Sequence, residues 1–208
     1  MINIHNEVHY VFKHNIGKRK TLKLKTEVLR KNANMHHPLL FTVRFHEGSQ
    51  GWQLPFQDGN SKTPIHQVDK TLCLVESNED TELTVVISTS SPNEVTFKLQ
   101  MIEVNDFFIR VDNDKNHTVK DLSVSSTDFV HVDLSSINGL VQIKVTSEED
   151  ICALVSVQPM KCPVASSAED VFGSGSWQTM LKLGAFAVNT RDYPNDGFYL
   201  SFLTLPGE

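Results

Sequence analysis

The feature of this sequence that most restricts its fold is a two-residue alternation of apolar and polar side chains. It is clearest in residues 21–28 and 39–45. Successive side chains of a strand point to opposite faces, so such runs predict strands with one face on a core. Further β-rich runs are predicted at 81–89, 95–104, 107–111, 129–134, 140–146, 151–157, 181–188 and 198–205.

A helical period of 3.6 is hard to find, and only 168–172 and 177–183 are expected to hold a helical turn. Turn signals such as Asn138-Gly139 separate the strands. The predicted fold class is therefore all-β, with two tandem antiparallel β-sandwich domains over 1–104 and 105–208. No apolar run approaches the roughly 20 residues of a membrane-spanning helix.

Charge and histidine are unevenly divided between the two predicted domains. Residues 1–103 hold 12 Lys and Arg against 11 Asp and Glu, whereas 104–208 hold 7 against 14. Seven of the nine histidines also lie in the first part. Because imidazole takes up a proton below about pH 6.5, the first part becomes cationic in mild acid while the second stays acidic.

The densest basic cluster lies in the first domain and is the candidate phosphate-binding site. Lys23 and Lys25 fall on one face of a predicted strand, where they could contact a phosphate backbone. The alternative is a solvated strand face on which lysines block an exposed edge. The candidate RNA-binding residues, including two histidines that become charged in acid, are Lys18, Arg19, Lys20, Lys23, Lys25, Arg30, Lys31, His36 and His37.

No pattern in the sequence indicates catalysis, a metal or a cofactor. Adjacent histidines on a strand point to opposite faces, so His36 and His37 cannot share a metal ion. There is no G-x-S-x-G elbow and no phosphate-binding glycine loop. We therefore expect a binding module without catalytic residues, metal ligands or a cofactor. A carbohydrate-binding β-sandwich is another possible class, since the chain has aromatic residues that could contact sugars.

The three cysteines, Cys73, Cys152 and Cys162, match no zinc-binding spacing. Their odd number is compatible with one disulfide and an unpaired cysteine, or with three thiols. Asn116-His117-Thr118 is an N-glycosylation sequon, which would place Asn116 on a surface loop of a secreted or lumenal protein.

Several strings, in order along the chain, resemble the extracellular domain of the SID-type (systemic RNA interference-defective) transmembrane family, possibly its cholesterol-uptake branch. The strings are Leu40-Phe41-Thr42-Val43-Arg44, Trp52-Gln53-Leu54-Pro55, Lys70-Thr71-Leu72-Cys73, Val104-Asn105-Asp106-Phe107, Cys152-Ala153-Leu154-Val155, Lys161-Cys162-Pro163-Val164, Trp177-Gln178-Thr179-Met180 and Arg191-Asp192-Tyr193-Pro194. The resemblance implies two jelly-roll-like domains on the extracellular or endolysosomal lumenal side of a membrane. It also implies a disulfide between Cys73 and Cys162, with Cys152 paired beyond Glu208; the rival pairing is Cys152–Cys162.

The resemblance further implies a role in uptake of double-stranded RNA, cholesterol or both. The expected direct activity is weak duplex RNA binding that strengthens in acid. The alternative is a structural module that assembles and caps a sterol-handling membrane region of the same protein. The expected partners are therefore double-stranded RNA, the protein's own transmembrane region and a second copy, with a dimer as the favoured oligomer.

Overall fold

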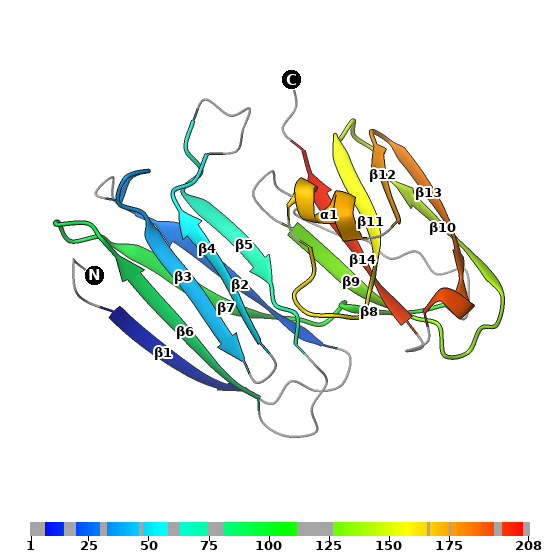
Figure 1. Cartoon of the computed structure of the whole chain (residues 1–208), viewed down its shortest axis with the longest axis horizontal. Coiled ribbons are helices and arrows are strands. Elements are labelled where there is room, and N and C mark those ends of the chain that lie inside the picture. The colour runs from blue at the N-terminus through cyan, green and yellow to red at the C-terminus, as the bar shows by residue number, and fades with distance from the viewer. Residues whose placement is uncertain are drawn as a thin grey trace. The chain divides into compact units, whose positions relative to one another are not determined.

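The structure is a computed structural model that describes residues 7–14, 20–29, 33–45, 48–57, 63–74, 81–111, 127–165, 167–174, 176–193 and 197–205. Most of the described residues lie in β-strands and very few lie in helices, as the alternation predicts (Figure 1). The chain divides into two compact units, Met1–Val104 and Asn105–Gly207. Among the described residues, no helix has the length and apolar character needed to cross a membrane.

The first unit holds two antiparallel sheets. Its described strands are β1 (Glu7–His14), β2 (Thr21–Val28), β3 (Leu39–Phe45), β4 (Gly48–Leu54), β5 (Gln67–Thr71), β6 (Thr81–Thr89) and β7 (Phe97–Val104). One sheet has the order β1-β6-β3-β4. In the other, β2 lies between β5 and β7.

The core of the first unit lies between these two sheets. Burial alternates along β2, so that Leu22 and Leu24 are fully buried. Phe41 on β3 stacks on Trp52 of β4, with ring centroids 5.8 Å apart. The indole Nε1 of Trp52 donates a hydrogen bond of 3.0 Å to Oγ1 of Thr26, which ties β4 to β2 across the core. Each fully buried leucine contributes roughly 1.5–3 kcal/mol to stability.

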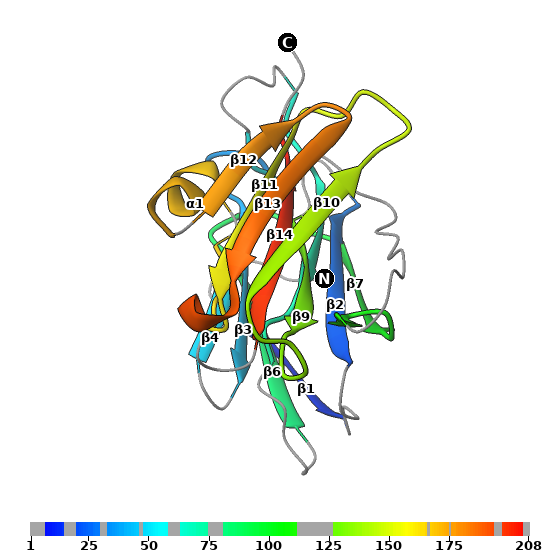
Figure 2. The ribbon, with the colours of Figure 1, turned by 90° about the vertical axis from the view of Figure 1, so that its right-hand side faces the viewer.

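The second unit also encloses an apolar core between two sheets. Its described elements are β8 (Phe108–Arg110), β9 (Thr127–Asp133), β10 (Leu140–Thr146), β11 (Ala153–Pro159), α1 (Ala168–Ser174), β12 (Ser176–Met180), β13 (Leu183–Asn189), the 3-10 turn η1 (Thr190–Asp192) and β14 (Gly197–Thr204). One sheet has the order β12-β11-β14-β9. The other is the β10–β13 pair (Figure 2).

Close approach of the backbone at the start of β14 requires a glycine. A Cβ on Gly197 would lie 2.7 Å from the Val132 carbonyl oxygen and 2.8 Å from Nε2 of His131. Any other residue here would push β14 away from β9, whose Asp133 it faces. Gly197 therefore serves the pairing of β14 with β9.

Two expectations from the sequence are wrong in detail. The helical turn predicted at 168–172 is confirmed by α1, but that at 177–183 is wrong, because Ser176–Met180 pairs with β11 as a strand. The pairing is also not antiparallel throughout, since β8 runs parallel to β9. A parallel pair needs a connection of about a dozen residues or more, and residues 111–126 supply that length.

Candidate functional site

The candidate site is the outer face of the paired strands β5, β2 and β7 in the first unit, which we call the outer lysine face. Because burial alternates on β2, Lys23 and Lys25 lie on the side opposite to Leu22 and Leu24. The strand register places Lys25 between Asp69 of β5 and Gln100 of β7. It places Glu27 between Gln67 and Lys98 in the same way, and these residues complete the outer lysine face.

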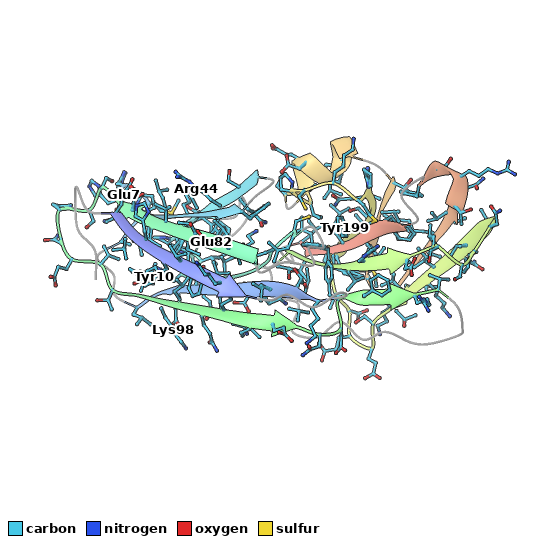
Figure 3. All side chains as sticks on the ribbon, turned by 90° about the horizontal axis from the view of Figure 1, so that it is seen from below. Glu7, Tyr10, Arg44, Glu82, Lys98 and Tyr199 are labelled. Carbon is cyan, nitrogen blue, oxygen red and sulfur yellow. The ribbon has the colours of Figure 1, made fainter. Side chains whose placement is uncertain are left out.

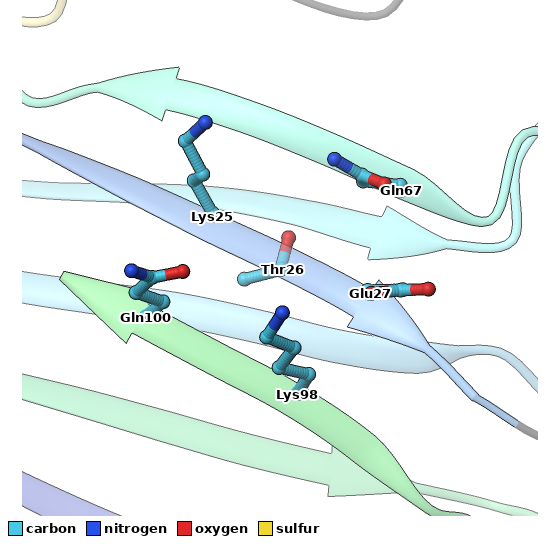
Figure 4. A pocket seen from close by; sticks show the side chains of 6 residues that line it. All are labelled: Lys25, Thr26, Glu27, Gln67, Lys98 and Gln100. Carbon is cyan, nitrogen blue, oxygen red and sulfur yellow. The ribbon is translucent and has the colours of Figure 1, made fainter. Parts of the chain in front are cut away.

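A shallow pocket of about 40 Å³ lies in this face (Figure 4). It is lined by Lys25, Thr26, Glu27, Gln67, Lys98 and Gln100. A space of this size holds about one water-sized group, so it suits a single phosphate oxygen better than a whole ligand. The lysine ammonium groups and the glutamine amides are the hydrogen-bond donors available to such a group.

The charge of Lys25 is partly neutralised within the face. Its Nζ lies 3.1 Å from Oδ2 of Asp69. The other carboxylate oxygen of Asp69 is buried and has no hydrogen-bond partner among the described residues. The ion pair is partly buried, because the Lys25 and Asp69 side chains are 38% and 18% exposed. Turning Lys25 toward an anion would leave the Asp69 carboxylate without this partner, so Asp69 opposes binding of the anion.

Lys98 is an exposed cation of this face and is not among the candidate residues that the sequence pattern indicates. Figure 3 shows it on the outer side of β7. No ion pair involves Lys98 within the described part of the chain. It stands directly opposite Glu27 in the β2–β7 register. The signal for it was the alternation in residues 95–104, but its proximity to Lys25 depends on strand pairing.

Lys20 is placed away from the outer lysine face. Its Nζ lies 2.5 Å from Oε1 of Glu103. Glu103 is the register partner of Leu22, whose side chain lies in the core. The ion pair therefore closes the core-facing side at the end of the sheet. Lys20 is therefore paired with Glu103 and is not part of the outer lysine face.

His36 and His37 lie in a turn before β3, which belongs to the other sheet. Their backbone N–H groups both donate to Oδ1 of Asn34, at 2.9 and 3.0 Å. Nδ1 of His37 lies 3.1 Å from Oγ of Ser90. The exposed His66 directly precedes Gln67 of the outer lysine face, and its carbonyl accepts a 2.9 Å hydrogen bond from the Val28 N–H at the end of β2.

Several predicted residues lie outside the described residues, and their placement stays a prediction: Lys18, Arg19, Arg30, Lys31 and Asn116. Of the cysteines, Cys73 and Cys162 are each disulfide-bonded, whereas Cys152 is free. Within the described ranges, no group of three or more His, Cys, Asp or Glu side chains could hold a metal ion.

The sequence matches proteins of the SID1 type. A family model described as the dsRNA-gated channel SID-1 matches residues 125–207. SID1 transmembrane family member 1 of Homo sapiens is 26% identical over 215 residues, covering 99% of this chain and 26% of that protein. The Rattus norvegicus protein of the same name is 26% identical, with 99% and 25% covered. Cholesterol uptake protein 1 of Caenorhabditis elegans is 28% identical over 169 residues, covering 81% of this chain and 21% of that protein.

The chain thus spans about a quarter of the length of the relatives it matches. The human match covers 99% of this chain and so includes the first 35 residues, in which none of the family-like strings lies. They confirm the resemblance to the SID-type family.

Proposed function

We propose that this chain, which resembles the SID-type transmembrane family along nearly its whole length, is a non-catalytic ectodomain of such a membrane protein. It lies on the extracellular or endolysosomal lumenal side and takes part in uptake of double-stranded RNA, cholesterol or both. The support is the nature of the matches, which are a family described as a dsRNA-gated channel and a protein named for cholesterol uptake.

The direct activity that the geometry supports best is weak binding of duplex RNA by the outer lysine face. The observation that supports this activity is that Lys23, Lys25 and Lys98 extend from two paired strands on one solvated face. Lysines two residues apart on a strand are about 6–7 Å apart, so they reach different phosphates. Contacts of this kind recognise the shape and charge of an A-form duplex and not its sequence.

The affinity should be low at neutral pH because the face also carries acidic groups. Its three lysines stand against two carboxylates, those of Glu27 and Asp69. Histidine side chains take up protons between pH 7.4 and 5.5. Seven of the nine histidines lie in residues 1–103, so mild acid raises the positive charge of this part of the chain. Binding should therefore strengthen in mild acid.

The test is a fluorescence anisotropy titration of labelled duplex RNA at pH 7.4 and 5.5, repeated over a range of salt concentrations. The variant Lys23→Gln/Lys25→Gln/Lys98→Gln removes three charges from the face. The matched control, Lys144→Gln/Lys161→Gln/Lys182→Gln, removes three charges from the second unit. The face variant should lose about tenfold or more in affinity, and its salt dependence should flatten by up to about 0.9 in slope for each lost phosphate contact. Equal binding by the face and control variants would remove the outer lysine face as the site.

A second candidate function is a structural module that assembles as a dimer and caps a sterol-handling membrane region. The observation that favours it is the commitment of Lys20 and Lys25 to the carboxylates of Glu103 and Asp69. Absence of RNA binding by the parent chain at both pH values in low salt, together with a concentration-dependent dimer in sedimentation velocity, would support this module. Phosphate binding weakens steeply with salt, whereas assembly need not.

Two covalent features complete the proposal. We propose that Cys73 and Cys162 are joined to each other, as the resemblance implies, and that Asn116 carries a glycan. Both features are typical of proteins that mature in an oxidising, secretory compartment. Peptide mapping under non-reducing conditions tests the pairing, and the mass shift after glycosidase treatment tests the glycan.

A further inference from the structure

A second pocket lies at one end of the second unit, apart from the outer lysine face. It is formed by the connection between β9 and β10 and by the η1 turn after β13. Its volume is about 420 Å³, within the range of small-molecule sites. It is lined by Leu134, Ser135, Ser136, Ile137, Asn138, Thr190, Arg191 and Tyr193.

The two walls of this pocket are joined by two hydrogen bonds between Gly139 and Thr190, one to a side-chain hydroxyl and one between backbone groups. The N–H of Gly139 donates to Oγ1 of Thr190 at 3.0 Å. The N–H of Thr190 donates back to the carbonyl oxygen of Gly139 at 2.9 Å. Gly139 has φ +126°, a conformation that favours glycine and lets the Asn138-Gly139 turn meet η1. The pocket is therefore formed before a ligand arrives, which lowers the entropic cost of binding.

The carboxylate next to the pocket is already compensated. Asp133 is buried, and its Oδ1 accepts the Ser135 N–H at 2.9 Å. Its Oδ2 lies 3.6 Å from Nε of Arg110. Burial alone would raise the pKa of Asp133, but the hydrogen bonds from Ser135 and the charges of Arg110 and His131 hold it below the ordinary value. This negative charge is therefore balanced and does not line the pocket.

Apart from the apolar Leu134 and Ile137, the residues that line the pocket are polar, and Arg191 is the one among them with a charge. Arg191 provides a guanidinium fork, the geometry that matches a carboxylate or phosphate. The Tyr193 ring packs on Phe198 with centroids 5.2 Å apart. Burial and the charge of Asp192 raise the pKa of Tyr193, so its phenol stays protonated and can donate. The Ser135, Ser136 and Asn138 side chains can both donate and accept, as the hydroxyl groups of a sugar require.

We propose that this pocket binds a sugar that carries an oxyanion, either a carboxylate or a phosphate. Arg191 contacts the oxyanion, and the Ser135, Ser136 and Asn138 side chains contact the sugar hydroxyls. Tyr193 donates its phenolic hydrogen and offers its ring to the apolar face of the sugar. This site is independent of the proposed RNA-binding face, because it lies in the other unit and its test uses single sugars.

The test is an amide NMR titration of the 208-residue chain with glucuronate, glucose 6-phosphate and uncharged glucose. Saturable shifts are expected for residues 134–139 and 190–193 with at least one of the two anionic sugars. Glucose should bind with an affinity at least about tenfold lower, since it lacks the charge-assisted contact. The comparison of the two anionic sugars separates a carboxylate site from a phosphate site.

Variants distinguish specific binding in this pocket from non-specific attraction of the anionic sugar to positive charge. Arg191→Gln should weaken binding about tenfold or more, and Tyr193→Phe, which keeps the ring on Phe198, should weaken it severalfold. The control Lys144→Gln removes one charge from the exposed face of β10 and should leave the affinity within about twofold of the parent. The proposal is overturned if neither anionic sugar gives saturable shifts at about 20 mM, a concentration on the order of the weakest useful affinities. It is also overturned if glucose binds as tightly as the anionic sugars, or if a folded Arg191→Gln chain binds them as tightly as the parent.

Discussion

A buried polar network in the second unit allows a stability prediction to be worked through in detail. Gln158 on β11 is almost fully buried, and its Nε2 donates to Oγ of Ser156 at 2.8 Å and of Ser201 at 2.9 Å. Its Oε1 accepts the N–H of Ala165 at 2.9 Å, which holds the segment before α1 against the sheet. The two serine hydroxyls also bond to each other at 2.7 Å.

The change Gln158→Ala removes three of these hydrogen bonds but not the one between Ser156 and Ser201. At roughly 1 kcal/mol for each bond, the loss is about 3 kcal/mol. The hydroxyls can still satisfy each other, whereas the Ala165 N–H loses its partner. That residue is only partly buried, so water can replace the glutamine there and limit the further cost. We therefore expect a loss of about 2–4 kcal/mol.

The assay is urea unfolding followed by tryptophan fluorescence. Trp177 lies opposite Ser156 in the β11–β12 register, so it reports on this sheet. The matched control is Gln142→Ala, which changes an exposed glutamine on β10 and should cost less than about 0.5 kcal/mol. A loss below about 1 kcal/mol for Gln158→Ala, or one equal to that of the control, would refute the view that this network stabilises the unit.

Three further predictions concern charge and the disulfide. The pKa of Asp133 lies below the ordinary value of 3.8, so its ionised form contributes stability that is present above about pH 4 and is lost as the pH falls through the folded-state pKa. Asp133→Asn should therefore lower the urea midpoint at pH 7, and the difference from the parent should shrink as the pH falls below about 4; a difference that does not change with pH would count against this role of Asp133. Lys70 is the cross-strand partner of Leu24 on the core-facing side, and burial lowers its pKa. The folded state therefore binds the Lys70 proton less well than the unfolded chain, and Lys70→Met should raise the melting temperature at pH 7. Lys98→Met on the outer face is the control, and a lower melting temperature for Lys70→Met would contradict the reasoning. If Cys73 and Cys162 are joined, replacing both by serine should cost roughly 4–5 kcal/mol in the chain-entropy model, while Cys152→Ser should have little effect; a peptide map that joins Cys152 to Cys162 would contradict the pairing.

The strands that the sequence predicts best are those with one face in a core. Residues 21–28 alternate because β2 presents one side to the apolar cluster and the other to solvent. The sequence does not indicate the β4 strand, because Gly48 and Gly51 interrupt the alternation of apolar and polar residues and Gly48 resembles a turn residue. The β12 strand was mistaken for a helical turn because four of its five residues are exposed and so carry no alternation.

The candidate sites depend on pairings that a local pattern does not contain. Alternation alone predicts that Lys23 and Lys25 share a face. Lys98 joins them only through the β2–β7 register. In the same way, the ion pair that neutralises Lys20 spans 83 residues. The sugar-binding pocket brings Asn138 and Arg191 together only because β10 pairs with β13.

The most direct test of the central proposal is to map the RNA contact on the chain itself. Amide and lysine side-chain NMR signals would be followed at pH 5.5 in low salt as unlabelled duplex RNA is added. The largest shifts are expected on β5, β2 and β7, with the side-chain signals of Lys23, Lys25 and Lys98 among them, and they should reverse when salt is added. Shifts confined to the second unit or to the β1-β6-β3-β4 sheet, or no shifts at all, would contradict the proposal that the outer lysine face binds RNA.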